Sequence, residues 1–195
     1  MVAQYSNRQS EILKMAIDII DSNGIQGFTI KNLSHSLGLT EAAIYRHFKS
    51  KLEILTAILD IFIDNLLSFS KTIISLKISS IEKIKRIYKQ LSEMFMKNPA
   101  YVSVIFAEEI FKNDELLSAK VEKILDINNE TFITIIEQGQ KNNEITEEVN
   151  SQELSLIIVG AYRLMVKRWK IYNFSYDLME SSDRLTDTIK ILITK

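Results

Sequence analysis

The chain has 195 residues, 46% of them hydrophobic, no cysteine, and a formal net charge of −1. This apolar fraction excludes disorder as the default, the missing cysteines exclude disulfides and thiolate metal sites, and the near-neutral charge leaves no global field that attracts nucleic acid. We find no signal peptide and no long apolar run, so we expect a cytoplasmic protein without a membrane span.

The first element predicted is a helix that begins after residue 6. Ser6 and Gln9 form a capping box, and apolar residues then repeat at helical spacing as far as Ile20. We expect Gly24 to end this helix and Phe28 to fill the small core beneath the helices that follow. Because glycine and proline are scarce, we expect an all-α chain of about nine helices.

Residues 29–55 read as a helix, a tight turn, a short helix and the start of a third helix. Thr29 and Thr40 are placed to cap the first two helices, Gly38 can take the left-handed conformation between them, and Ser50 with Glu53 forms a capping box for the third. Two short helices joined by such a turn make a helix-turn-helix, whose second helix suits the DNA major groove.

The run G-L-T-E-A-A-I-Y-R-H-F-K-S-K-L-E-I-L, residues 38–55, resembles the signature of the TetR family of bacterial transcriptional repressors. The spacing of Tyr45, His47, Phe48 and Lys51 carries the resemblance, because a generic helix-turn-helix does not require it. The sequence departs from this signature at four positions. The changes at residues 39 and 40 are conservative, residue 42 is alanine in place of Gly or Pro, and residue 43 is alanine in place of Thr. These changes bear on which operator sequence is read.

A long helix is expected over residues 51–75, with a single apolar stripe from Leu55 to Ile73. No flexible linker separates it from the motif, so we expect it to join two parts rigidly. The predicted domains are residues 1–50, which hold the DNA-binding motif at about 29–48, and residues 51–195, a helical domain for effector binding and dimerisation.

Three further helices are expected, after the cap at Ser79, after Asn98 and Pro99, and after Asp114. The first carries a basic cluster (Lys83, Lys85, Arg86 and Lys89), which we interpret as a solvated face rather than a second nucleic-acid patch. The second is expected to continue through Ile110 and Phe111. On the third, Asn128 falls on the apolar stripe, where it either contacts a ligand or bonds to neighbouring backbone.

Two amphipathic helices close the chain, one from Ser151 to about Trp169 and one from Leu178 to about Leu192, with a turn at residues 173–175. On the first, Ile157 is expected to face inward, and Gly160 would be explained by the close approach of a neighbouring backbone. The pair could complete a monomer core or pair with a second copy. The resemblance implies the second, a homodimer through a four-helix interface, with candidate residues Leu154, Ile158, Ala161, Met165, Leu178, Leu185 and Ile189.

Catalytic chemistry has little support. His35 and His47 lack a ligand set with metal spacing, there is no phosphate loop or serine elbow, and the adjacent pairs Glu108–Glu109 and Glu147–Glu148 diverge on a helix. We therefore expect no enzyme activity, no catalytic residue, no metal and no cofactor.

The resemblance implies roles for the motif on double-stranded, pseudo-palindromic operator DNA. Residues at the positions of Thr29, Tyr45, His47 and Lys51 mainly hold phosphates, with Thr40 at the helix start, whereas those at Lys31, Glu41, Ala43 and Arg46 are placed to read bases.

A small, mostly apolar effector is expected to bind the second domain and release DNA, although the same residues would fill an ordinary core. The candidate effector-binding residues are Phe62, Tyr88, Phe95, Phe106, Asn128, Phe132, Tyr162 and Trp169. The alternative functions are an architectural or division-linked DNA-binding adaptor without an effector, and an enzyme or carrier that only resembles the family. The regulator is expected in the cytoplasm, on the nucleoid.

Overall fold

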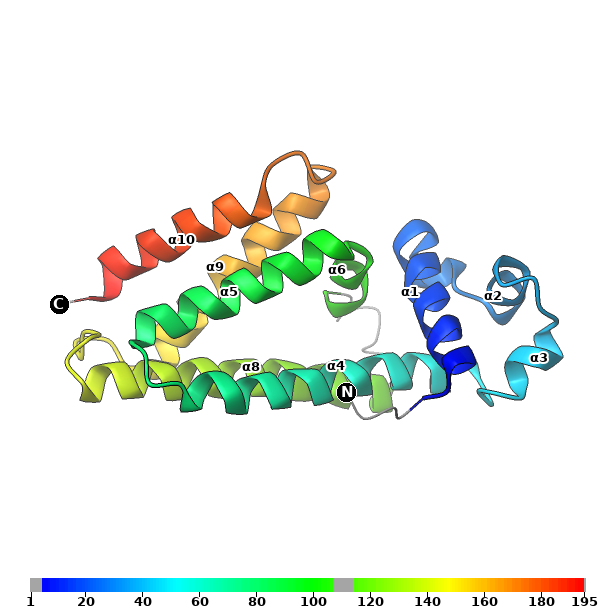
Figure 1. Cartoon of the computed structure of the whole chain (residues 1–195), viewed down its shortest axis with the longest axis horizontal. Helices are drawn as coiled ribbons and strands as arrows, with labels where there is room; N and C mark the ends of the chain where they lie inside the picture. Colours follow the sequence, from blue (N-terminus) through cyan, green and yellow to red (C-terminus); the bar gives the residue numbers. More distant parts are fainter. Residues whose placement is uncertain (1–4, 107–113, 195) are drawn as a thin grey trace. The chain divides into compact units, whose positions relative to one another are not determined.

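The computed structural model describes residues 5–106 and 114–194, and these residues form helices joined by short turns (Figure 1). The all-α prediction is confirmed for them. The helices are α1 (Asn7–Gly27), α2 (Ile30–Ser36), α3 (Glu41–Tyr45), α4 (Lys51–Ser75), α5 (Ser80–Lys97), α6 (Ala100–Ile105), α8 (Glu115–Lys141), α9 (Ser151–Ile171) and α10 (Leu178–Ile193). None of the described helices combines the length and apolar composition needed to cross a bilayer.

The chain divides into two compact units. The first comprises the residues up to Ile63 together with Pro99–Glu122, and the second comprises Asp64–Asn98 and Lys123–Lys195. Helices α4 and α8 each begin in the first unit and end in the second.

Helix α1 begins where the sequence predicts, but it continues beyond Gly24, the residue expected to end it. The Ser6 hydroxyl accepts a hydrogen bond from the Gln9 amide, and the Gln9 side chain accepts one from the Ser6 amide. Gly24 breaks the helical backbone with φ +68°, although one more turn follows before the helix ends at Gly27. Phe28 is fully buried, as expected of a core residue.

The first unit also contains α6 and the start of α8. Helix α6 packs against α1, and the Ser103 hydroxyl donates a hydrogen bond to the Asp21 carboxylate. The Lys120 ammonium lies 2.5 Å from an Asp60 carboxylate oxygen, which ties α8 to α4. Helix α6 and the start of α8 therefore pack as part of the unit that holds the helix-turn-helix. The residues expected to extend α6, Ile110 and Phe111, lie outside the described residues, as do Glu108 and Glu109.

The second unit is built around α5, whose apolar face packs against α10 among others. Lys83, expected on a solvated basic face, is instead only 5% exposed. Its ammonium donates to the Ile74 carbonyl at 2.8 Å and to the Gln138 side chain at 2.7 Å. The prediction was wrong for Lys83 because the C-terminal end of α4 offers it a carbonyl oxygen that the sequence alone does not place there.

Gly139 lies where a second helix and a loop meet α8. A Cβ atom on it would lie 2.7 Å from Ile145 Cδ1 and 2.9 Å from Ser80 Cβ, which is closer than side-chain atoms approach one another. Only glycine fits this position without moving its neighbours.

We expect Gly139→Ala to lower the free energy of unfolding by about 1–3 kcal/mol, because the added methyl group overpacks a closed site. Urea unfolding followed by circular dichroism measures this loss. Lys141→Ala, on the exposed next turn of α8, serves as the control and should change the unfolding midpoint little.

Candidate nucleic-acid interface

The helix-turn-helix consists of α2 and α3 over a small apolar core. Leu33 and Ile44 are fully buried, and Phe48 is 2% exposed. The Thr29 and Thr40 hydroxyls accept hydrogen bonds from the amides of Asn32 and Ala43, so each caps its helix as predicted. These contacts fix the orientation of α3 by local and core interactions together.

The turn between the two helices depends on Gly38, which has φ +64° and no neighbouring atom where a side chain would begin. This conformation is the one predicted from the sequence, because residues with a side chain rarely adopt it. The Gly38 amide donates to the His35 carbonyl at 3.1 Å, so the turn is set by the backbone of Gly38 rather than by side-chain packing.

The next helix, α4, begins at Lys51. Ser50 caps it by accepting a hydrogen bond from the Glu53 amide. The Glu53 carboxylate accepts from the Lys49 amide rather than from the Ser50 amide, so the predicted capping box closes one residue earlier.

Most residues assigned to DNA contact lie at the surface of this motif. The side chains of Thr29, Lys31, Thr40, Glu41, Tyr45 and Arg46 are exposed, and those of Ala43 and His47 are partly exposed. The backbone carbonyl of His47 accepts a hydrogen bond from Gln9, which fixes the end of the recognition helix to α1.

The motif also presents cations that no described carboxylate neutralises. Arg8 pairs with Glu11 at 2.6 Å. Lys31, Arg46 and Lys49 have no such partner among residues 5–106 and 114–194. Lys49 is not among the residues predicted from the sequence to contact DNA, although it follows the recognition helix by only a few residues and is exposed. Three unpaired cations on one short motif supply the local positive charge that a near-neutral chain needs to bind DNA.

Lys51 is placed differently from the other assigned residues. Its ammonium donates to the Ile25 carbonyl at 3.1 Å and lies 5.3 Å from the centre of the Phe28 ring. Partial burial lowers the pKa of this ammonium. The structure therefore directs Lys51 into the protein, against the turn that follows Gly24, and does not support a main role in holding phosphate.

Four aromatic residues assigned to an effector form a closed core in the second unit. The rings of Tyr88 and Tyr162 stack at 4.4 Å, with Phe132 6.2 Å from Tyr88, and Phe95 is 2% exposed. The Tyr88 hydroxyl donates to the Ile158 carbonyl at 2.6 Å, and the Tyr162 hydroxyl lies 2.9 Å from the Ser92 hydroxyl. Burial raises the pKa of both tyrosines. These side chains are packed against one another, and the two tyrosine hydroxyls are hydrogen-bonded.

The remaining effector candidates are dispersed. Trp169 is buried and donates to the Tyr176 carbonyl at 2.9 Å. Asn128 is half-buried, and its amide donates to the Ile124 carbonyl of the same helix at 3.1 Å, which is the backbone alternative considered for it. Phe62 and Phe106 are half-buried and belong to the first unit.

The predicted dimer residues divide into two groups. Leu154, Ile158, Leu178 and Ile189 are at most 4% exposed within the single chain, so they form its core and leave no surface for a partner. Ala161, Met165 and Leu185 remain partly exposed. Ile157, expected to face inward, is 55% exposed. The apolar surface of α9 and α10 is instead formed by Leu156, Ile157, Leu164, Ile171, Ile191 and Leu192.

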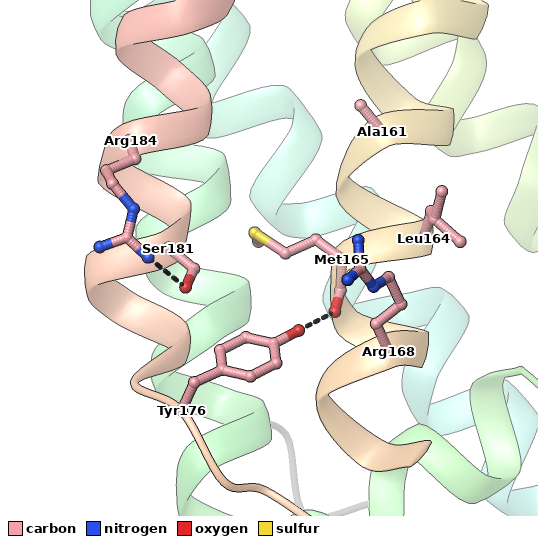
Figure 2. A pocket seen from close by; sticks show the side chains of 7 residues that line it. All are labelled: Ala161, Leu164, Met165, Arg168, Tyr176, Ser181 and Arg184. Carbon is pink, nitrogen blue, oxygen red and sulfur yellow. Dashed lines mark hydrogen bonds between the residues drawn. The ribbon is translucent and has the colours of Figure 1, made fainter. Parts of the chain in front are cut away.

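A groove of about 450 Å³ lies between α9 and α10 on this outer face (Figure 2). Tyr176 closes one end, where its hydroxyl donates to the Met165 carbonyl at 2.7 Å. Arg184 on α10 pairs with Glu180 at 2.5 Å and also bonds the Ser181 hydroxyl. The groove is lined by Ala161, Leu164, Met165, Arg168, Tyr176, Ser181 and Arg184.

No three His, Asp or Glu side chains gather closely enough to hold a metal ion among the described residues.

Comparison with known proteins identifies the N-terminal part. Residues 12–58 match the family model described as bacterial regulatory proteins, tetR family. The nucleoid occlusion factor SlmA of Glaesserella parasuis serovar 5 (strain SH0165) is 27% identical over 187 residues, which are 95% of this chain and 92% of that protein.

Solved structures agree in fold. The regulator FadR from Bacillus subtilis in complex with stearoyl-CoA has a TM-score of 0.79 at 19% identity, covering 92% of this chain and 96% of that chain. The ketosteroid regulator KstR2 of Mycobacterium tuberculosis has a TM-score of 0.83 at 18% identity, covering 99% and 98%. The fold predicted for the whole chain is thereby confirmed.

We expect Lys51→Met to lower the free energy of unfolding by about 1 kcal/mol, because it removes the carbonyl bond and the cation over Phe28 but keeps the aliphatic stem. The salt dependence of DNA binding should not change. Lys49→Met, the matched control, should leave stability unchanged and reduce the salt slope by about one. Fluorescence anisotropy titrations at about 50–200 mM salt, where phosphate contacts change the affinity steeply, measure the salt slope of DNA binding for both variants. A shallower slope for Lys51→Met would restore the phosphate role.

Proposed function

We propose that this chain, a DNA-binding regulator of the tetR family, represses transcription as a homodimer on a pseudo-palindromic operator and is released by a small, mostly apolar effector. The observation that carries the proposal is the exposed recognition helix, bordered by three cations without carboxylate partners. We expect such a repressor to be located in the cytoplasm, on the nucleoid.

The contacts to DNA follow from which groups the motif exposes. The hydroxyls of Thr29, Thr40 and Tyr45 and the His47 imidazole are donors suited to phosphates, and each threonine still has its hydroxyl hydrogen to give after capping. Glu41 and Ala43 lie on α3, the short helix expected to enter the major groove, Arg46 directly follows it as its C-cap, and Lys31 lies on α2. Of these groups the Arg46 guanidinium is the one suited to bidentate contact with guanine.

Dimerisation is supported by the outer face of α9 and α10. Monomeric proteins rarely leave several large apolar side chains exposed on one face, yet Leu156, Ile157, Leu164, Ile171, Ile191 and Leu192 do so here. A two-fold arrangement through this face would present two recognition helices to half-sites about 34–36 Å apart.

Effector binding is supported by the aromatic content of the second unit and by the complex of FadR with stearoyl-CoA, a ligand with a long apolar chain. Helices α4 and α8 pass from this unit into the DNA-binding unit, where α6 also contacts α1. A ligand that separates the packed aromatics would have to move at least one of these helices. A coupling of about 1–3 kcal/mol would weaken operator binding roughly 5- to 150-fold.

A second function is favoured by one observation. The SlmA relatives are named nucleoid occlusion factors, and an adaptor of this kind would bind DNA without an effector. One property distinguishes the two functions, because only the repressor requires DNA binding that a small molecule relieves.

We expect DNase footprinting on enriched genomic fragments to give a symmetric protected site, bound by a dimer. An acyl thioester or sterol-like compound that releases the protein would support the effector. Symmetric binding that no apolar compound relieves would favour the adaptor, and a monomer on an asymmetric site would contradict both.

We expect Asn128→Leu to fold and to bind the operator normally, because Asn128 is half-buried and bonded only to its own helix. If its amide also contacts the effector, the concentration of compound needed for release should rise. An unchanged response would mean that the effector pocket lies elsewhere or is absent.

A further inference from the structure

Two opposite charges on the outer face of α9 lack a partner. The Glu153 carboxylate forms no hydrogen bond or ion pair with the described residues, although its backbone amide is capped by Asn150. Arg168 lies 5.7 Å from the Tyr172 ring, and no described carboxylate pairs with it. The two are fifteen residues apart on one continuous helix, hence about 22 Å along it, so they cannot meet within one copy.

The residues between them form a stripe at helical spacing. Ile157 is 55% exposed and Leu164 59% exposed. Gly160 lies between them, and a Cβ atom on it would meet nothing within 4 Å. Residues 153, 157, 160, 161, 164 and 168 therefore share one face of α9, with large apolar groups on either side of a shallow centre.

We propose that α9 of one copy packs antiparallel against α9 of a second copy and crosses it at Gly160 and Ala161. Leu164 of each copy then contacts Ile157 of the other, and Arg168 of each copy pairs with Glu153 of the other. The proposal rests on the homodimer proposed above and gives it a register.

The register follows from symmetry. In a two-fold antiparallel pair, every contacting pair of positions must have the same midpoint. The pairs 153 with 168, 157 with 164, and 160 with 161 all have their midpoint between Gly160 and Ala161. One register therefore satisfies charge complementarity, apolar contact and the placement of the smallest side chains at the crossing together. Glycine and alanine at the crossing permit the short interaxial distance, about 8 Å, at the low end for packed helices.

The groove between α9 and α10 gains an occupant in this arrangement. Its α9 wall includes Ala161, Leu164 and Arg168 (Figure 2), which are the positions that face residues 153–160 of the second copy. Arg184 on the opposite wall is already neutralised by Glu180, whereas Arg168 is free to bind Glu153 of the second copy. The groove is therefore a seat for the first turns of the neighbouring α9.

Cysteine cross-linking tests the register directly, because the natural chain has no cysteine. We expect the double variant Glu153→Cys/Arg168→Cys to form a covalent dimer under mild oxidation. Each single variant should form none, because equivalent positions in the two copies lie about 22 Å apart in an antiparallel pair. Ala161→Cys, next to the symmetry axis, should cross-link alone.

A charge swap tests the ion pair. Glu153→Arg and Arg168→Glu should each raise the dimer dissociation constant several-fold, measured by analytical ultracentrifugation at low salt, and combining them should restore it. Lys89→Glu, the same charge change on the exposed face of α5, is the control and should have no effect.

The outcomes separate the register from the homodimer. A dimer in which the double cysteine variant fails to cross-link, or in which Arg168→Cys cross-links alone, overturns the register and leaves the homodimer standing. A monomeric natural chain overturns both. Swapped charges that weaken the dimer without mutual rescue show that Glu153 and Arg168 do not meet.

Discussion

The DNA-reading part of the chain depends on the burial of Phe28. Its side chain is fully buried, and the Lys51 ammonium lies 5.3 Å from its ring centre while donating to the Ile25 carbonyl. Gly24 interrupts the helical backbone with a positive φ, so the chain changes direction four residues before Phe28. The threonine caps of α2 and α3 then act on helices whose starting points are already fixed.

Two elements that follow α5 in sequence, α6 and the start of α8, also belong to the DNA-binding unit. Helix α6 packs on α1, and Lys120 on α8 pairs with Asp60 on α4. The chain therefore passes between the two units three times, within α4, between Asn98 and Pro99, and within α8. The sequence predicts only the passage through α4, since side-chain pairing between distant helices produces no periodic pattern.

Local signals were sufficient for most of the fold. Thr29, Gly38 and Thr40 act on backbone within a few residues, and the sequence predicted each of them correctly. Lys51 and Lys83 could not be placed in this way, because the carbonyls that bind them belong to other helices. Helix α9 shows a different limit. It is apolar on two faces, so periodicity identified the helix but could not tell the core residue Ile158 from the surface residue Ile157.

The two faces of α9 place different demands on any effector. Its inner face holds Tyr162, which stacks on Tyr88 and is hydrogen-bonded through its hydroxyl. Opening this core for a ligand would break buried hydrogen bonds, so the fraction of molecules in the open state would limit the apparent affinity for the effector. If the outer face carries the dimer, a ligand that displaced α9 from within would change the dimer interface as well.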